Sequence, residues 1–173
     1  MRASITVRAI LAAFGPRVAA AQVPQACTLI TTEELKAAFG GTGDAHKTEL
    51  QIPSGPAKGQ TMNGCMWSIG EQGMLTLSVM PAMKGAAREA GIAQLRQVYA
   101  SLLAKGWTEE KKEIPGGNCS QMTPPASEKD APMMVGCMAE AKGQAISIGT
   151  LGKTKYSIEQ VKPFFDKVVK RIH

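Results

Sequence analysis

Four cysteines are the residues of this sequence with the clearest chemistry. They stand at positions Cys27, Cys65, Cys119 and Cys137, and none of their spacings is Cys-x-x-Cys. Without that spacing, neither a thioredoxin-type redox pair nor a zinc ribbon is indicated. An even number of cysteines in an oxidising compartment predicts two disulfides. Three connectivities are possible. We favour Cys27–Cys65 with Cys119–Cys137, because each bond then joins neighbouring segments of one half of the chain.

The sequence contains few residues suited to acid-base catalysis. The two histidines, His46 and His173, are too few for a Ser-His-Asp triad or a multi-histidine metal site. Two carboxylate pairs, Glu33/Glu34 and Glu109/Glu110, could serve a small carboxylate-dependent envelope hydrolase, since that chemistry needs two acids facing one bond. The first pair suits the first turn of a helix, and the second lies beside two lysines as on a solvated strand. We therefore expect no catalytic residue.

Methionines offer one further kind of chemistry. Met122, Met133, Met134 and Met138 gather around the second cysteine pair, and thioethers are suitable ligands for Cu(I). A Met-based Cu(I)-binding protein is therefore a second alternative. Core packing is the preferred interpretation because methionine is common throughout the chain, so we expect no metal and no cofactor.

The C-terminal part of the chain is rich in basic residues. A surface for an anionic partner, either an envelope protein or an anionic envelope polymer, is therefore one hypothesis, and a solvated helix face is the other. The residues of this surface are Lys153, Lys155, Lys162, Lys167, Lys170 and Arg171.

The N-terminus has the pattern of a secretory signal peptide. A basic start at Arg2 and Arg8 precedes a short apolar stretch and the Ala19-Ala-Ala21 cleavage motif. We predict cleavage after Ala21, which leaves residues 22–173 as a single domain in the periplasm or outside the cell. Cleavage removes Arg2, Arg8 and Arg17 and lowers the formal charge from +6 to +3. A net charge this small does not favour nucleic-acid binding. No later segment is apolar enough to span a membrane.

Hydrophobic periodicity predicts the elements that position these residues. Three helices are expected, at 31–39 with Thr31 and Glu34 as a capping box, at 85–105, and from Ser157 to Ile172 with Pro163 inside or near its start. Strands are expected at 48–52 and 107–114. Two hairpins are expected, one from 65–69 and 74–80, the other from 133–140 and 144–148. The polar loops are 53–63 and 124–130.

The order of these elements predicts an α+β fold. Two helix-plus-hairpin units are implied, with antiparallel sheet or sheets covered by helices and held by two disulfides. Nothing among these residues identifies an active site. The favoured function is therefore that of an uncharacterised exported protein that binds or interacts without catalysis, through its two polar loops.

The segment Cys27-Thr-Leu-Ile-Thr-Thr-Glu-Glu-Leu-Lys-Ala-Ala-Phe-Gly40, followed by Gly64-Cys65-Met-Trp67, resembles a known pattern. It is similar to that of small bacterial envelope proteins, secreted proteins and lipoproteins of unknown function, which open with a Cys-x-Leu-Leu-Thr-x-x-Glu helix. The resemblance implies an envelope location and a structural Cys27–Cys65 bond. It implies no activity, and the residues before Cys27 do not form the lipobox that many of those proteins carry.

Overall fold

A computed structural model describes residues 23–41, 43–71, 73–128, 130–152 and 156–172. The described helices are α1 (Thr32–Phe39), α2 (Gly85–Leu103) and α3 (Ile158–Arg171), with short 3-10 turns η1 (Ala26–Thr28) and η2 (Ala126–Glu128). The described strands are β1 (His46–Gln51), β2 (Thr61–Ile69), β3 (Gly73–Pro81), β4 (Thr108–Ile114), β5 (Gly117–Thr123), β6 (Met133–Ala141) and β7 (Gln144–Gly152). The predicted signal segment, 1–21, lies outside the described residues.

The strands form one antiparallel sheet in the order β1-β2-β3-β7-β6-β5-β4. Both predicted hairpins are present, and they meet where β3 pairs with β7 in the middle of the sheet. The β6–β7 turn consists of Lys142 and Gly143 with φ angles of 48° and 76°, which is the left-handed backbone that two-residue hairpins use. The expected α+β class is confirmed, whereas a division into two helix-plus-hairpin units is not, because the second half of the chain contributes four strands.

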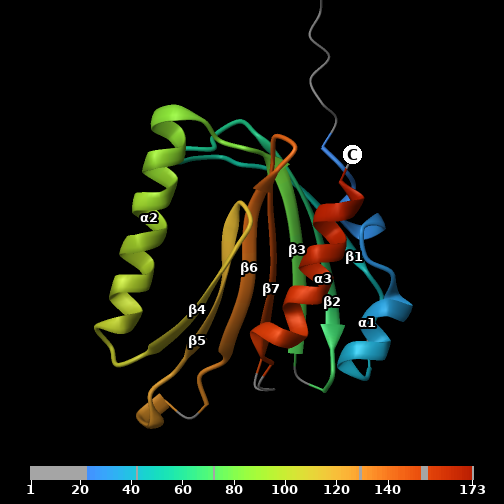
Figure 1. Ribbon diagram of the computed structural model, residues 1–173, viewed down its shortest axis with the longest axis vertical. Helices are drawn as coiled ribbons and strands as arrows, with labels where there is room; N and C mark the ends of the chain where they lie inside the picture. The colour runs from blue at the N-terminus through green and yellow to red at the C-terminus, as the bar shows by residue number, and fades with distance from the viewer. Residues whose placement is uncertain (1–22, 42, 72, 129, 153–155, 173) are drawn as a thin grey trace, which may run out of the picture.

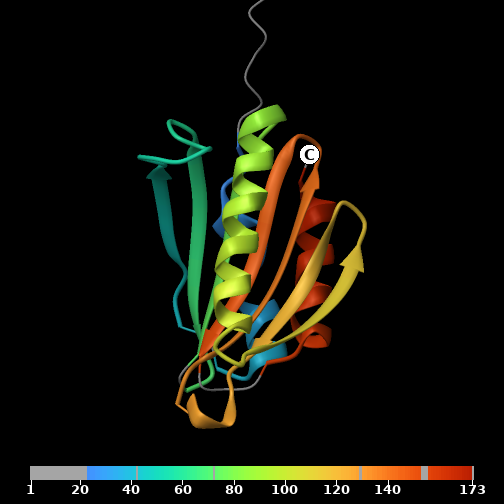
Figure 2. The same ribbon diagram turned by 90° about the vertical axis from the view of Figure 1, so that its left-hand side faces the viewer.

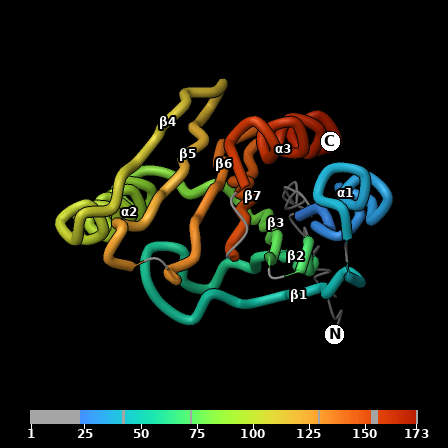
Figure 3. Tube along the Cα trace, turned by 90° about the horizontal axis from the view of Figure 1, so that it is seen from below, coloured from blue at the N-terminus to red at the C-terminus, as the bar shows by residue number. Residues whose placement is uncertain are grey.

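Helices cover both faces of the sheet. Figure 3 shows α1 and α3 on one side of the strands and α2 on the other, and Figure 1 shows α3 running along the strands. The sequence predicts that helices cover the sheet, and the structure places them on both of its faces. The two faces are therefore available for different roles.

The main core lies between the sheet and α3. Trp67, Leu75, Leu77 and Ile148 point into it from the strands, and each is at most 1% exposed. The apolar stripe of α3 packs against them, as its three-four spacing predicted. The buried residues of this stripe are Ile158, Val161, Phe164, Phe165, Val168 and Ile172. Pro163 lies inside the helix, which begins at Ile158 after the N-cap Ser157.

The N-terminal elements close one end of this core. Helix α1 begins with the predicted capping box, in which the Glu34 N–H donates to Thr31 Oγ1 and the Thr31 N–H donates to Glu34 Oε2. Phe39, at its C-terminal end, lies 5.3 Å from the rings of both Tyr156 and Phe164, measured between ring centroids. The N- and C-terminal parts of the chain are thereby packed into one body. No described helix has the length and hydropathy of a transmembrane span.

Candidate functional site

The sheet face beneath α2 differs from the face beneath α3. Neighbouring residues of a strand point to opposite faces, so the side chains between the core residues form the α2 side. The hydroxyl of Tyr99 on α2 lies 3.1 Å from the hydroxyl of Ser120 on β5, which fixes this assignment. The α2 side of the central strands carries small residues where the α3 side carries large apolar ones. These small residues are Thr76, Ser78, Gly136, Ser147 and Gly149.

Helix α2 lies across this face without being buried in it. None of its nineteen residues is buried, although the periodicity of Ile92, Leu95, Tyr99 and Leu102 predicts one buried stripe. Leu95 is 43% exposed, and its neighbour Val98 is 52% exposed. Figure 2 shows α2 in front of the sheet along nearly its whole length. The helix therefore covers the sheet without sealing it.

Two polar contacts hold α2 over the sheet, and we call them the struts. At the N-terminal end, Arg88 Nε donates to Glu140 Oε1 on β6 at 2.9 Å. At the C-terminal end, the second strut is the Tyr99–Ser120 hydrogen bond. Both ends of the helix adjoin glycines with positive φ, Gly85 at 54° and Gly106 at 85°, a backbone that β-carbon-bearing residues adopt only with strain.

The sheet beside the Tyr99 strut is not covered by helix atoms at Gly136, which pairs with Ser120. A Cβ built on Gly136 would have only two heavy atoms within 4 Å, the Ile148 oxygen and the Gly149 Cα, and neither belongs to α2. The atoms nearest to the same point on Gly149 belong to β3 and β6. Ser147, on a central strand, is exposed. Solvent therefore reaches the sheet beneath α2, and we call this space the α2 groove.

Methionines line the α2 groove and the sheet around it. Six are half-buried, and Met122 is buried at 2% exposure. The strand register pairs Met122 with Met134 and Met134 with Leu151, and Leu151, at 41% exposure, pairs in turn with Met74. The methionines on this side are Met62, Met66, Met74, Met80, Met122, Met134 and Met138. The lining is thus apolar and flexible, because methionine has an unbranched side chain.

The two polar loops singled out from the sequence lie near opposite ends of α2, and the first is shorter than predicted because β2 begins at Thr61. The segment 53–60 runs beside the N-terminal end of the helix in all three ribbon and tube views. At the other end, the Cβ position of Gly106 is 3.6 Å from Pro125. Both loops therefore lie at the borders of the α2 groove.

The four cysteines are bonded as preferred, Cys27 to Cys65 and Cys119 to Cys137. The register places Cys65, Leu77, Ile148, Cys137 and Cys119 in one row across the strands on the α3 side. The second bond joins directly paired residues of β5 and β6. Both bonds therefore brace the buried face of the sheet and lie away from the α2 groove.

The predicted cationic surface is partly paired within the protein. Arg171 donates to both carboxylate oxygens of Glu34 at 2.8 and 2.9 Å, and Lys167 donates to Glu34 at 3.1 Å. Hydrogen bonds from Arg171, from the Thr31 backbone and from Lys167 lower the pKa of Glu34 to about 2. Lys162 pairs with Asp166. Lys170 is left without such a partner among the described residues, and Lys153 and Lys155 lie outside them.

The other candidates for chemistry are not brought together. Glu34 faces α3, whereas Glu109 and Glu110 are exposed neighbours on β4 and point to opposite faces. Likewise Met133 and Met134 lie on opposite faces of β6, so the four methionines considered for Cu(I) do not share one surface. Among the described residues, no group of histidine, cysteine and acidic side chains is arranged to hold a metal.

A small pocket lies between α3 and the β4–β5 turn. Its volume is about 190 Å³, and its lining is largely apolar. Asp166, at its rim, is already bonded to Lys162 at 2.6 Å. The lining residues are Ile114, Pro115, Phe165, Asp166, Val169 and Lys170. Lys170, which has no ion-pair partner among the described residues, is its one unpaired charged group. A volume of about 190 Å³ holds only a small ligand, so the more extensive apolar surface of the α2 groove is the stronger candidate site.

The sequence did not reveal the α2 groove. A usable signal is the alternation of core residues with small or thioether residues in β3, β6 and β7. In β3, for example, Leu75, Leu77 and Val79 alternate with Thr76 and Ser78. Small side chains on one face of a sheet leave space there unless the covering helix lies close to the strands.

The fold is similar to that of a solved extracellular domain. The extracellular domain of PknH from Mycobacterium tuberculosis aligns with a TM-score of 0.56 at 13% sequence identity, over 85% of this chain and 94% of that one. At this identity the similarity concerns the fold alone. No protein-family model and no curated protein matches the sequence.

Proposed function

We propose that this protein is an exported, non-catalytic binding module whose ligand occupies the α2 groove. One observation carries the proposal: an apolar helix face and a thioether-lined sheet face are opposed to each other, and solvent reaches both. The opposite side of the same sheet is packed to less than 2% exposure at most of its large side chains. The large apolar side chains that stay exposed among the described residues belong to α2 and to the sheet face on its side.

Export is supported by three independent features. Two disulfides occur in the described structure, and disulfides persist mainly in oxidising compartments. The N-terminal sequence has the pattern of a signal peptide. The solved structure of similar fold is an extracellular domain.

The exposed apolar surface has an energetic cost that a ligand would remove. Full burial of a leucine or valine stabilises a protein by about 1.5–3 kcal/mol. Leu95 and Val98 are about half exposed, so the ligand-free fold forgoes on the order of 2 kcal/mol at these two positions alone. Contiguous exposed apolar surface of this kind marks binding sites in soluble proteins. The methionines can adapt their rotamers to a ligand, as on other adaptable binding surfaces.

A fluorescent apolar probe tests the proposal. N-phenyl-1-naphthylamine is uncharged and fluoresces on entering an apolar site, so its titration reports binding to the disulfide-bonded protein. Ser147→Phe places a ring on the exposed centre of the floor, whereas Ser147→Thr adds a single methyl group. We expect Ser147→Phe to weaken probe binding about tenfold, which is a loss of about 1.4 kcal/mol, and Ser147→Thr to leave it nearly unchanged.

Ser147→Phe should remain folded because residue 147 is exposed in the native strand and phenylalanine favours strands. Far-UV circular dichroism and the urea midpoint of the variant are the measurements that check its folding. Absence of probe binding to the wild-type protein, or equal binding by a folded Ser147→Phe variant, contradicts the proposed function.

A further inference from the structure

The edge strand β1 has backbone groups that point away from the sheet. The Ile52 N–H donates to the Gln60 oxygen at 2.9 Å, and these two residues continue the β1–β2 register by one step. Hydrogen-bonded and non-hydrogen-bonded pairs alternate along an antiparallel ladder, so the even-numbered residues of β1 bond to β2. The N–H and C=O groups of Lys47, Glu49 and Gln51 therefore face outward.

The neighbouring ladders agree with this assignment. The Ala82 N–H donates to the Gly143 oxygen at 2.9 Å, on the extension of the β3–β7 register, so the even-numbered residues of β3 bond to β7 and the odd-numbered ones to β2. Alternation across β2 then leaves its even-numbered residues to bond to β1. Figures 2 and 3 show β1 at the margin of the molecule, with no other described strand or helix outside it. This edge is open to another chain.

The charges of β1 are complementary to a second copy of the same strand. When two copies pair antiparallel about a two-fold axis at Thr48, Lys47 of each copy lies opposite Glu49 of the other. Opposite charges across strands stabilise a sheet, as do paired threonines. Lys47 and Glu49 have outward backbone groups, so each of these pairs also exchanges two hydrogen bonds. Their side chains are 55% and 58% exposed, which leaves them accessible to a partner strand.

Only one register has this complementarity. An axis at Lys47 places that lysine opposite itself, and an axis at Glu49 does the same for the glutamate, and like charges directly opposite each other destabilise a sheet. The axis at Thr48 also places Leu50, which is 51% exposed, opposite His46 of the second copy. This pair is of the non-hydrogen-bonded kind, in which side chains approach most closely. The favoured register therefore covers exposed apolar surface as well.

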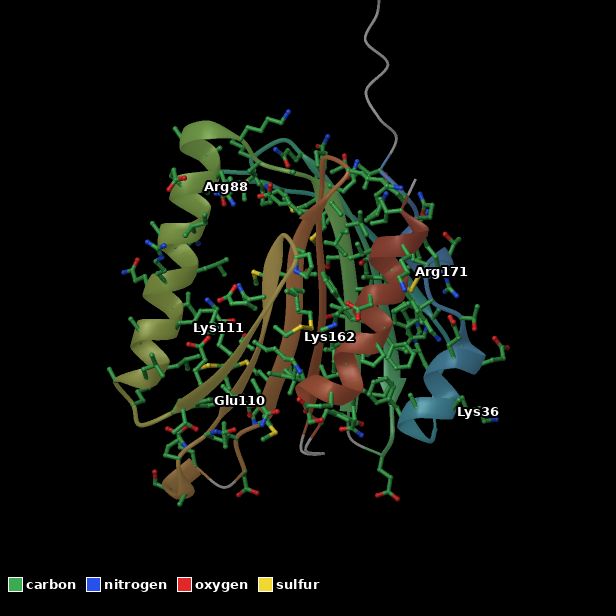
Figure 4. The ribbon with its side chains drawn as sticks, viewed as in Figure 1. Lys36, Arg88, Glu110, Lys111, Lys162 and Arg171 are labelled. Carbon is green, nitrogen blue, oxygen red and sulfur yellow. A yellow bond between two sulfur atoms is a disulfide. The ribbon has the colours of Figure 1, made fainter. Side chains whose placement is uncertain are left out.

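The opposite edge of the sheet lacks this complementarity. Residues 109–113 of β4 are all charged, so a two-fold axis at any of them places a charge opposite its own copy. Figure 4 shows Glu110 and Lys111 along this strand. Charged residues of this kind keep an edge strand from pairing. A second copy is therefore favoured at β1 and opposed at β4.

From these placements we infer that two copies of this protein associate through β1 into a two-fold dimer with one continuous sheet. Paired residues of antiparallel strands point to the same face, so the axis is perpendicular to the sheet and both α2 grooves open on one side. The strand contributes six residues per copy, against about 20–30 in a standard interface, so the dimer is weak and reversible. The inference does not depend on the proposed function.

Sedimentation velocity of the disulfide-bonded protein, from micromolar to millimolar concentration, measures the association. We expect a monomer–dimer equilibrium without larger species, because a two-fold interface closes on itself. Amide exchange followed by NMR locates the contact. The N–H groups of Lys47 and Glu49 should exchange more slowly as the concentration rises, whereas the Thr48 N–H, which faces β2, should change little.

Charge reversal tests the register. Lys47→Glu and Glu49→Lys should each weaken dimerisation about tenfold or more, because two attractive pairs become repulsive. The double variant K47E/E49K restores both attractive pairs and should dimerise like the wild type. An equimolar mixture of the two single variants should form a heterodimer, because every charge of one copy then faces an opposite charge of the other.

Lys111→Glu is the matched control. Lys111 also lies on an edge strand beside a glutamate two positions later, Glu113 at 2.7 Å, so this change removes a similar pair within the chain and should leave dimerisation unchanged.

Three results would overturn the inference. One is a protein that stays monomeric at millimolar concentration. Another is dimerisation that neither the double variant nor the mixture of single variants recovers. The third is an equal loss of dimerisation in Lys111→Glu and Lys47→Glu. None of these results concerns probe binding at the α2 groove, so the proposed function is tested separately.

Discussion

Replacing Glu34 with glutamine should destabilise the protein by an amount that depends on pH. The Glu34 carboxylate joins α1 to the end of α3 through Arg171 and Lys167. Glutamine keeps an amide oxygen for the Thr31 N–H, so the helix cap can persist while the ion pairs are lost. The change therefore isolates the electrostatic link between the two ends of the described chain.

The magnitude follows from the pKa of Glu34, which hydrogen bonding from Arg171 and then from Thr31 and Lys167 lowers from 4.5 to about 2. A difference of about 2.5 between unfolded and folded pKa values corresponds to an upper limit of about 3 kcal/mol. The side chains of Arg171 and Lys167 are 40% and 50% exposed, and solvent screening at exposed partners reduces the expected loss to about 1–2 kcal/mol.

Because the folded-state pKa is the lower one, this stabilisation is complete above pH 4.5 and disappears as the pH falls toward 2. Urea unfolding of the wild-type protein and Glu34→Gln, measured at several pH values from 7 to 2.5, gives the difference directly. Thr31→Ala is the control, because loss of a cap costs about 1 kcal/mol by a route that does not require an ionised carboxylate partner. A difference between wild type and Glu34→Gln that stays constant down to pH 2.5, or that is absent at pH 7, refutes the reasoning.

Two further predictions concern the buried side of the sheet. Changing Cys119 and Cys137 together to alanine opens a loop with a sequence separation of 18 and should cost about 3 kcal/mol, seen as a lower urea midpoint; an unchanged midpoint contradicts a stabilising role. Phe165→Ala removes a side chain that is 1% exposed and should cost about 3–5 kcal/mol. Val98→Ala, at a half-exposed position of α2, should cost no more than about 0.5 kcal/mol. Comparable losses from Phe165→Ala and Val98→Ala in thermal unfolding would show that α2 is packed as tightly as α3.

Local sequence patterns correctly predicted a helix cap, a hairpin turn and the apolar side of a helix. The capping box of Thr31 and Glu34, the Lys142-Gly143 turn and the stripe of α3 are all present. Each depends on residues only a few positions apart, whose physical preferences do not require knowledge of distant partners.

Strand β5 was not predicted because its sequence argues against a strand. The segment Gly117–Thr123 contains Gly117, Asn118 and Gln121, which are not typical strand formers. Its pairing with β4 and β6 and the Cys119–Cys137 bond supply what local preference lacks. The strand is thus a product of tertiary contacts, which override weak propensity.

The sequence correctly predicted helix α2 and its apolar stripe. It also predicted that this stripe is buried, whereas no residue of α2 is buried in the structure. Periodicity tells which side of a helix is apolar, and it does not tell how near the opposing surface lies. That distance depends on the small side chains of Ser147 and Gly136 and on the struts at Arg88 and Tyr99. None of these features can be recognised before the sheet register is known.

The Cys27–Cys65 bond also determines how the domain would carry a mechanical load. A pull on the chain ahead of Cys27 passes through the sulfur atoms to the middle of β2, and α1 and β1 are bypassed. Since β2 is paired on both edges, with β1 and β3, the force would be shared by strands on either side. Reduction of this bond would redirect the same pull onto η1 and α1.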